Sequence, residues 1–130
     1  MTENKLPQKF IKLSGDFINN LKNIYQEDLT SIILYGSAAS GEFIDKHSNI
    51  NLLVVLKDAG LKSLKRSSAL VHNSKFRVFK PLFLTEDYIK TSLDIFPIEF
   101  LDIQENHVVM FGKDVIKDLS IGLKNLKFQC

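Results

Sequence analysis

The chain has 130 residues, 45% of them hydrophobic and 25% charged, which is enough apolar material for the core of one globular domain. A net charge of +2 is too small to indicate a nucleic-acid partner by itself, and the single cysteine, Cys130, excludes an internal disulfide and fits a reducing compartment. No apolar segment follows the amino terminus as in a signal peptide, and no run approaches the ~18 apolar residues of a membrane span. We therefore expect a soluble cytoplasmic protein, with residues 1–130 forming one domain.

Residues 4–26 predict a long amphipathic helix. Apolar residues recur there at steps of three and four, as expected for a helix with one buried face: Leu6, Phe10, Leu13, Phe17, Leu21 and Ile24. Because proline is tolerated only in the first turn of a helix, the regular helix is expected to start near Pro7. Its simplest role is to pack on a sheet.

Two apolar, β-branched runs follow, joined by a turn rich in glycine and serine. The first, over 29–35, predicts a buried strand that ends at Gly36, and Ser37 is a good N-cap for a short helix. A strand that breaks into a helix at Gly-Ser directs free backbone N–H groups at one point, which suits a phosphate. The second run, over 48–56, predicts a strand with Asn49 and Asn51 on one face, near the turn.

Gly36-Ser37, a short helix and then Ser48-Asn49-Ile50-Asn51 leading an apolar strand resemble the polymerase beta-type nucleotidyltransferase superfamily over roughly residues 29–112. The resemblance implies that Gly36 and Ser37 hold the phosphates of a nucleotide. It also implies that Asn49 and Asn51 stand at the positions of two aspartates that ligate two divalent metal ions, with a third carboxylate from a later strand. An active member would need Mg²⁺ and a nucleoside triphosphate.

The sequence departs from this family at the metal ligands, because both aspartates are asparagine here. An amide oxygen can ligate Mg²⁺, but it carries no charge to offset that of the ion. A pair of unit charges 4 Å apart is worth ~4 kcal/mol at an effective dielectric constant of 20, so losing two carboxylates should cost several decades of metal affinity. We therefore expect a catalytically degenerate nucleotidyltransferase-like domain.

Other polar residues could in principle replace the missing carboxylates. Glu42, Asp45 and His47 lie in the segment 42–48, where a solvated loop is the better interpretation. Residues 61–74 predict a modest helix, and the stretch 57–80 is rich in lysine and arginine. We favour a solvated helix face there over steering of a nucleotide or RNA, so nucleic acid is not the preferred partner.

Three strands and a helix are expected next. Residues 77–84 predict a strand that Pro81 places at a sheet edge or makes irregular, and Thr85 is expected to cap a helix. Residues 98–103 predict a strand that contains Glu99, our candidate for the third carboxylate of the catalytic site. An ion pair or exposure to solvent is an equally good explanation of Glu99. Residues 107–112 predict a last short strand that begins at His107, a structural or exposed histidine.

The predicted fold is α/β (α+β): a mixed, twisted sheet of about five strands with helices mainly on one face. Bacterial proteins similar to the stretch 96–103 continue into a helical domain, so 113–130 would be its start, and the uncovered apolar surface would favour a homodimer. Three hypotheses follow. The first is a degenerate module that binds a nucleotide through Gly36, Ser37 and nearby basic residues, or only presents a surface to a protein partner. The second is an active Mg²⁺-dependent transferase that moves a nucleotidyl group to a small molecule, protein or RNA. The third is a structural dimerisation or antitoxin-like module.

Overall fold

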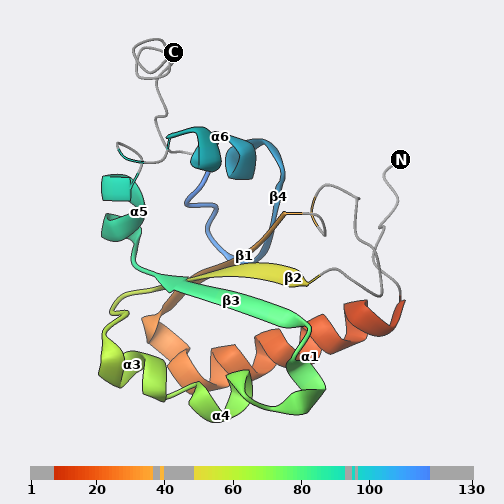
Figure 1. Cartoon of the computed structure of the whole chain (residues 1–130). Coiled ribbons are helices and arrows are strands. Elements are labelled where there is room, and N and C mark those ends of the chain that lie inside the picture. The colour runs from red at the N-terminus through yellow and green to blue at the C-terminus, as the bar shows by residue number, and fades with distance from the viewer. Residues whose placement is uncertain (1–7, 37–38, 40–48, 93–94, 96, 118–130) are drawn as a thin grey trace.

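A mixed four-stranded sheet forms the centre of the molecule (Figure 1). The structure, a computed structural model, describes residues 8–36, 39, 49–92, 95 and 97–117. Within them the strands are β1 (Leu29–Tyr35), β2 (Ile50–Leu56), β3 (Phe79–Leu84) and β4 (His107–Gly112), in the order β3-β2-β1-β4. β1 runs antiparallel to β2 and β4, whereas β2 and β3 are parallel. The predicted mixed sheet is confirmed, and β3, which carries Pro81, is an edge strand.

One face of the sheet is covered by α1 (Gln8–Tyr25), α3 (Leu61–Lys65) and α4 (Ser68–Val71). α1 turns its apolar stripe to the sheet, and the ring of Phe17 stacks on that of Phe79 with centroids 4.6 Å apart. The buried Tyr25 hydroxyl lies 2.8 Å from the Ser63 carbonyl oxygen and 2.8 Å from the Ser67 hydroxyl, which fastens α1 to the segment after β2. A 3-10 helix, Gln26–Asp28, connects α1 to β1.

The expected single helix over 61–74 is wrong. The chain forms α3, then α4, and then a 3-10 helix, Ser74–Phe76. Ser67 lies at the break, and its hydroxyl bonds to Tyr25 and contacts the Leu64 carbonyl oxygen at 3.4 Å. Serine side chains that bond to nearby backbone groups compete with helix continuation. The break thus brings Ser67 to α1.

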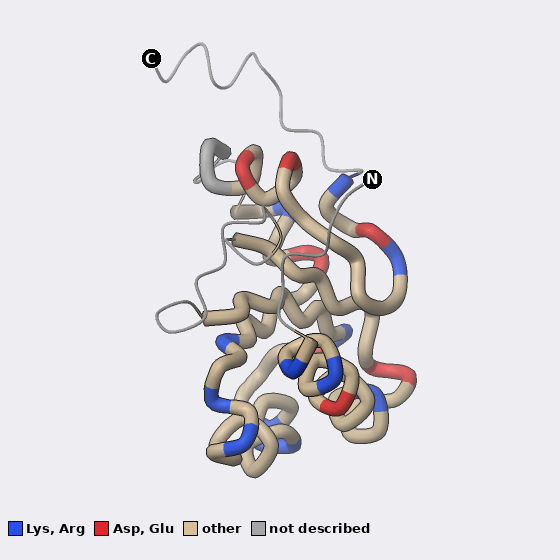
Figure 2. The backbone as a smooth tube through the Cα atoms, turned by 90° about the vertical axis from the view of Figure 1, so that its right-hand side faces the viewer, with Lys and Arg blue, Asp and Glu red and all other residues tan. Residues whose placement is uncertain are grey.

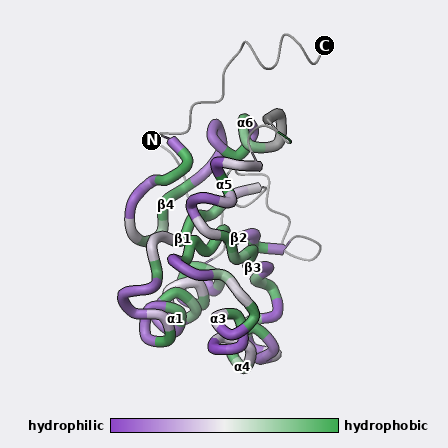
Figure 3. The backbone as a smooth tube through the Cα atoms, turned by 90° about the vertical axis from the view of Figure 1, so that its left-hand side faces the viewer, coloured by the Kyte–Doolittle hydropathy of each residue, from purple (hydrophilic) through white to green (hydrophobic). Residues whose placement is uncertain are grey.

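The second face is covered by α5 (Glu86–Ser92), α6 (Pro97–Glu105) and the turn after β4 (Figure 3). Their buried residues pack on alternate side chains of the two central strands: Ile33, Leu53, Val55, Ile89, Phe100, Val115 and Ile116. Thr85 caps α5 as expected, because its hydroxyl accepts the Tyr88 backbone N–H at 3.1 Å. The described helices therefore lie on both sides of the sheet.

The strand predicted over 98–103, with Glu99 in it, is a helix. α6 begins at Pro97, and proline is favoured at the first position of a helix because its fixed φ angle suits that position and its missing N–H is not needed there. Phe100 and Ile103, three residues apart, both pack on the second core cluster. Glu99, expected on the fourth of about five strands, therefore belongs to a helix. No helix in the described part of the chain is long and apolar enough to cross a bilayer.

Candidate functional site

The turn after β1 requires glycine for two reasons. Gly36 has a φ angle of 81°, in the left-handed region that side chains disfavour. A Cβ atom at this position would also lie 2.7 Å from Nδ2 of Asn51. Asn51 therefore packs directly on the turn, as the alternation of strand residues predicted. The Ala39 backbone N–H donates to the Gly36 carbonyl oxygen at 3.0 Å, whereas Ser37, the other predicted phosphate ligand, lies outside the described residues.

A row of polar side chains crosses the sheet at this end. Tyr35 is the register partner of Asn51 on β2 and of His107 on β4. Asn51 is in turn the register partner of Lys80 on β3. Register partners project from the same face of a sheet, here the face that α5 and α6 cover. Asn49 is exposed and immediately precedes β2.

From the sequence, Lys80 was only one of the cations of the basic stretch 57–80, with no predicted place in this row. It is exposed, and it follows Arg77, a second exposed cation, into the amino end of β3. Figure 2 faces this end of the sheet, and lysine and arginine positions dominate its lower left, on the β3 side. The sequence shows a lysine next to Pro81, but only the parallel register places it beside Asn51.

The residues of this row do not fit a divalent metal ion. Cations such as Mg²⁺ are held by anionic and neutral oxygen ligands, whereas Asn51 offers one amide oxygen and its neighbour Lys80 a positive charge. The described residues contain no group of three or more histidines, cysteines or carboxylates that could hold a metal. Glu42, Asp45 and His47 lie outside the described part, and a catalytic role for Glu99, now placed in α6, stays a prediction.

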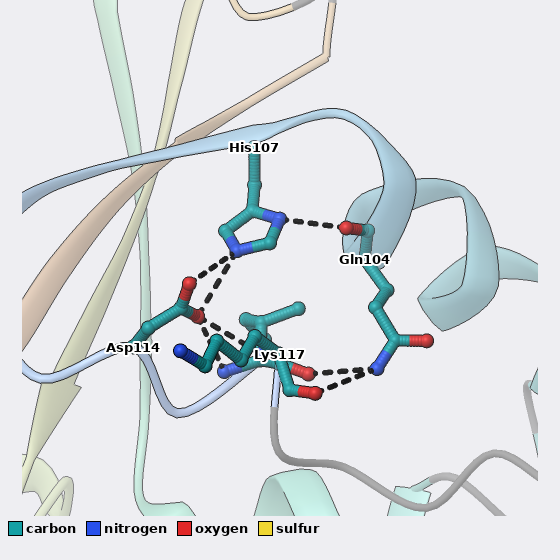
Figure 4. Close-up of polar contacts among 5 residues, drawn as sticks. Gln104, His107, Asp114 and Lys117 are labelled. Carbon is teal, nitrogen blue, oxygen red and sulfur yellow. Dashed lines mark hydrogen bonds and ion pairs between the residues drawn. The ribbon is translucent and has the colours of Figure 1, made fainter.

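His107, at the other end of the row, has a structural environment. Its Nδ1 lies 2.9 Å from the Gln104 carbonyl oxygen and its Nε2 lies 2.8 Å from Oδ2 of Asp114 (Figure 4). Because both ring nitrogens face acceptors, the protonated imidazolium can donate both bonds. The Gln104 amide donates to the Ile116 carbonyl oxygen at 3.1 Å, so this network fastens the turn after β4 to α6.

Two pKa values near this end of the sheet are shifted. Burial alone would raise the pKa of Asp114, but hydrogen bonds from His107 and from the backbone of Lys117 and Ile116, together with the charge of His107, outweigh it and lower the pKa. Burial raises the pKa of the Tyr35 hydroxyl. Asp114 therefore stays an anion at neutral pH, and Tyr35 stays neutral.

A shallow hollow of about 380 Å³ lies at the opposite end of the sheet. Its lining includes Asp58 and Gly60, which follow β2, and Thr85 and Tyr88, which follow β3. This hollow is therefore separate from the polar row, which lies where β2 and β3 begin.

Solved structures establish the fold. An inferred nucleotidyltransferase from Sulfolobus solfataricus superposes with a TM-score of 0.56 at 16% identity, over 81% of this chain and 82% of that one. Spectinomycin adenyltransferase AAD(9) from Enterococcus faecialis, solved with ATP and spectinomycin, gives 0.58 at 12% identity over 88% of this chain and 63% of the enzyme. A toxin-antitoxin structure with AMP-PNP gives 0.51 at 13% identity, over 88% and 85%. No protein-family model and no curated protein matches the sequence. The chain has the nucleotidyltransferase fold.

Proposed function

We propose that this chain is a nucleotide-binding module on the nucleotidyltransferase fold that has lost two-metal nucleotidyl transfer and acts through regulation or through a protein partner. The observation that carries the proposal is the junction of Gly36 and Asn51. The turn keeps the left-handed glycine that a close approach of backbone to ligand requires, while the side chain packed on it is a neutral amide instead of a carboxylate. Binding can therefore persist where metal-assisted chemistry does not.

Calorimetric titration of ATP and GTP, together with an assay for pyrophosphate release in Mg²⁺, tests this proposal. We expect binding of at least one nucleotide and no pyrophosphate release above that of a protein-free control. Gly36→Asp, which adds a carboxylate at the turn, should abolish binding because it repels phosphate. Gly36→Asn is the matched control, because it brings the same Cβ atom into the left-handed conformation and against Asn51 but carries no charge.

An active transferase is the alternative that this experiment separates. It would use Glu99, with Glu42 or Asp45, to hold a single Mg²⁺. In that case the wild-type chain would release pyrophosphate from a nucleoside triphosphate in Mg²⁺, and Glu99→Gln would stop the release while leaving the fold intact. That pair of results would overturn the degenerate-site proposal.

A partner-binding module of the dimerisation or antitoxin type is a second candidate function. The toxin-antitoxin structure with the same fold favours it, and so does the edge strand β4, on which Val108 is 45% exposed. Sedimentation velocity should then show a homodimer, and Val108→Glu should convert it to a monomer. If the wild-type chain is a monomer at every concentration, homodimerisation is refuted.

A further inference from the structure

We propose that Lys80 takes the place of the divalent cation at this site, so that the chain binds the phosphates of a nucleoside triphosphate directly and without Mg²⁺. The inference rests on the proposed function, because it names how the same site holds its ligand. It also explains the mismatch between the fold and the residues of the polar row. A site that cannot hold a metal ion still has to neutralise a polyphosphate.

The geometry places the Lys80 ammonium within reach of the turn. Lys80 and Asn51 are register partners on neighbouring parallel strands, which lie ~4.8 Å apart, and they project from the same face. Asn51 itself lies against Gly36. The flexible four-carbon stem of a lysine spans the remaining distance to a phosphate seated at the turn. The turn after β1 and the strands β2 and β3 therefore bring Gly36, Asn51 and Lys80 close together.

The charge of Lys80 is available for a ligand. Three other cations in the described part of the chain are paired with acids: Arg66 with Asp28 at 2.8 Å, Lys113 with Glu86 at 3.1 Å, and Lys75 with Asp16 at 3.8 Å. Lys80 forms no ion pair with any described residue, and its side chain is exposed. An exposed cation without a local acid attracts anions and repels Mg²⁺.

The amide of Asn51 fits the same ligand. An ionised carboxylate only accepts hydrogen bonds, so it repels a phosphate oxygen unless a metal ion lies between them. An asparagine carries an NH₂ group that donates to phosphate directly. Nδ2 of Asn51 is the atom next to the turn. Asn51 and Lys80 thus change the local chemistry in the same direction, from metal binding to anion binding.

The experiment measures binding of ATP by calorimetry in EDTA and again in excess Mg²⁺, using the full chain. We expect binding in EDTA that weakens in Mg²⁺, because the metal complexes the phosphates. Lys80→Met should weaken binding in EDTA about 10- to 100-fold, the value of a hydrogen bond to a charged group, and Lys80→Arg should largely preserve it. Lys62→Met, an exposed lysine on α3 after the far end of β2, is the matched control and should bind like the wild type. Thermal unfolding of each variant confirms that it is folded.

Failure of the inference and failure of the proposed function give different results. Binding of ATP that requires Mg²⁺, or a Lys80→Met variant that binds like the wild type, overturns the role of Lys80 and leaves nucleotide binding in place. No binding of ATP or GTP under either condition overturns the proposed function and the inference with it. Titration with tripolyphosphate separates the two sources of phosphate: affinity equal to that for ATP would overturn a nucleotide as the ligand.

Discussion

The contact between Gly36 and Asn51 can be measured as a coupling between two substitutions. Gly36→Ala places a Cβ atom where the φ angle is 81° and where Asn51 Nδ2 would lie 2.7 Å away. The left-handed conformation costs a residue with a side chain about 1–2 kcal/mol. Moving the Asn51 side chain off its rotamer costs about 0.5–1.5 kcal/mol more. We therefore expect Gly36→Ala to lower the free energy of unfolding by about 1.5–3.5 kcal/mol.

The same substitution in an Asn51→Ala background should cost less. With the amide removed, only the backbone strain remains, so the cost should fall to about 1–2 kcal/mol, and the coupling energy should be about 0.5–1.5 kcal/mol. Urea unfolding of the four chains of this cycle measures these differences, provided that the slope of free energy against urea is the same in all four.

Gly112→Ala is the internal control. Gly112 has a φ angle of 79°, and a Cβ atom there would collide with the Thr30 carbonyl oxygen, a backbone atom that cannot turn away. Its cost should exceed that of Gly36→Ala and should be the same with or without the Asn51 side chain. Equal costs of Gly36→Ala in both backgrounds would refute the packing of Asn51 on the turn, and with it the site as described.

Three further results are expected. Asp114→Asn should lower the free energy of unfolding by about 1–3 kcal/mol at neutral pH. Because the pKa of Asp114 is lowered in the folded state, this difference in stability from the wild type should shrink below pH 3.8, the ordinary pKa of the group. Acid unfolding curves of the two chains measure it. The pKa of Tyr35 is raised in the folded state, so stability should fall as the pH rises above its ordinary value of 10.0, and Tyr35→Phe should remove that part of the alkaline loss. Asn49→Asp with Asn51→Asp should create Mg²⁺ binding, measured by calorimetry, that tightens about 10- to 100-fold when Lys80→Met is added; no tightening would contradict the proximity of Lys80.

Hydrophobic periodicity predicted most of the described elements. The three- and four-residue steps of Phe10, Phe17 and Leu21 matched α1, and the alternation in 48–56 placed Asn51 on the correct face of β2. These signals are local and long enough to be unambiguous. The sequence therefore predicted that Asn51 lies near Gly36, but not how closely the two residues pack.

Two of the differences between prediction and structure have different physical causes. A short apolar run such as 98–103 fits a buried strand and a buried helix equally well, and Pro97, interpreted as the end of one helix, instead begins another. Lys80 was predicted only as part of the basic stretch 57–80, because its place beside Asn51 depends on the parallel pairing of β2 with β3, whose register is set by tertiary packing over the whole sheet. The local sequence pattern contains no information about this register.

The formal charges of the family's metal site can be compared with those of the residues at the same end of the sheet in this chain. In the family that the sequence resembles, three carboxylates hold two divalent ions, and together these carry a net formal charge of plus one. Here Asn49 and Asn51 are neutral and Lys80 carries plus one, so these three residues present a positive charge to a polyphosphate without any metal. Loss of the carboxylates alone would leave a neutral site with nothing to attract an anion. Under our proposal, loss of the carboxylates together with a lysine in register leaves a site suited to binding phosphate but without the metal ions that align an attacking oxygen.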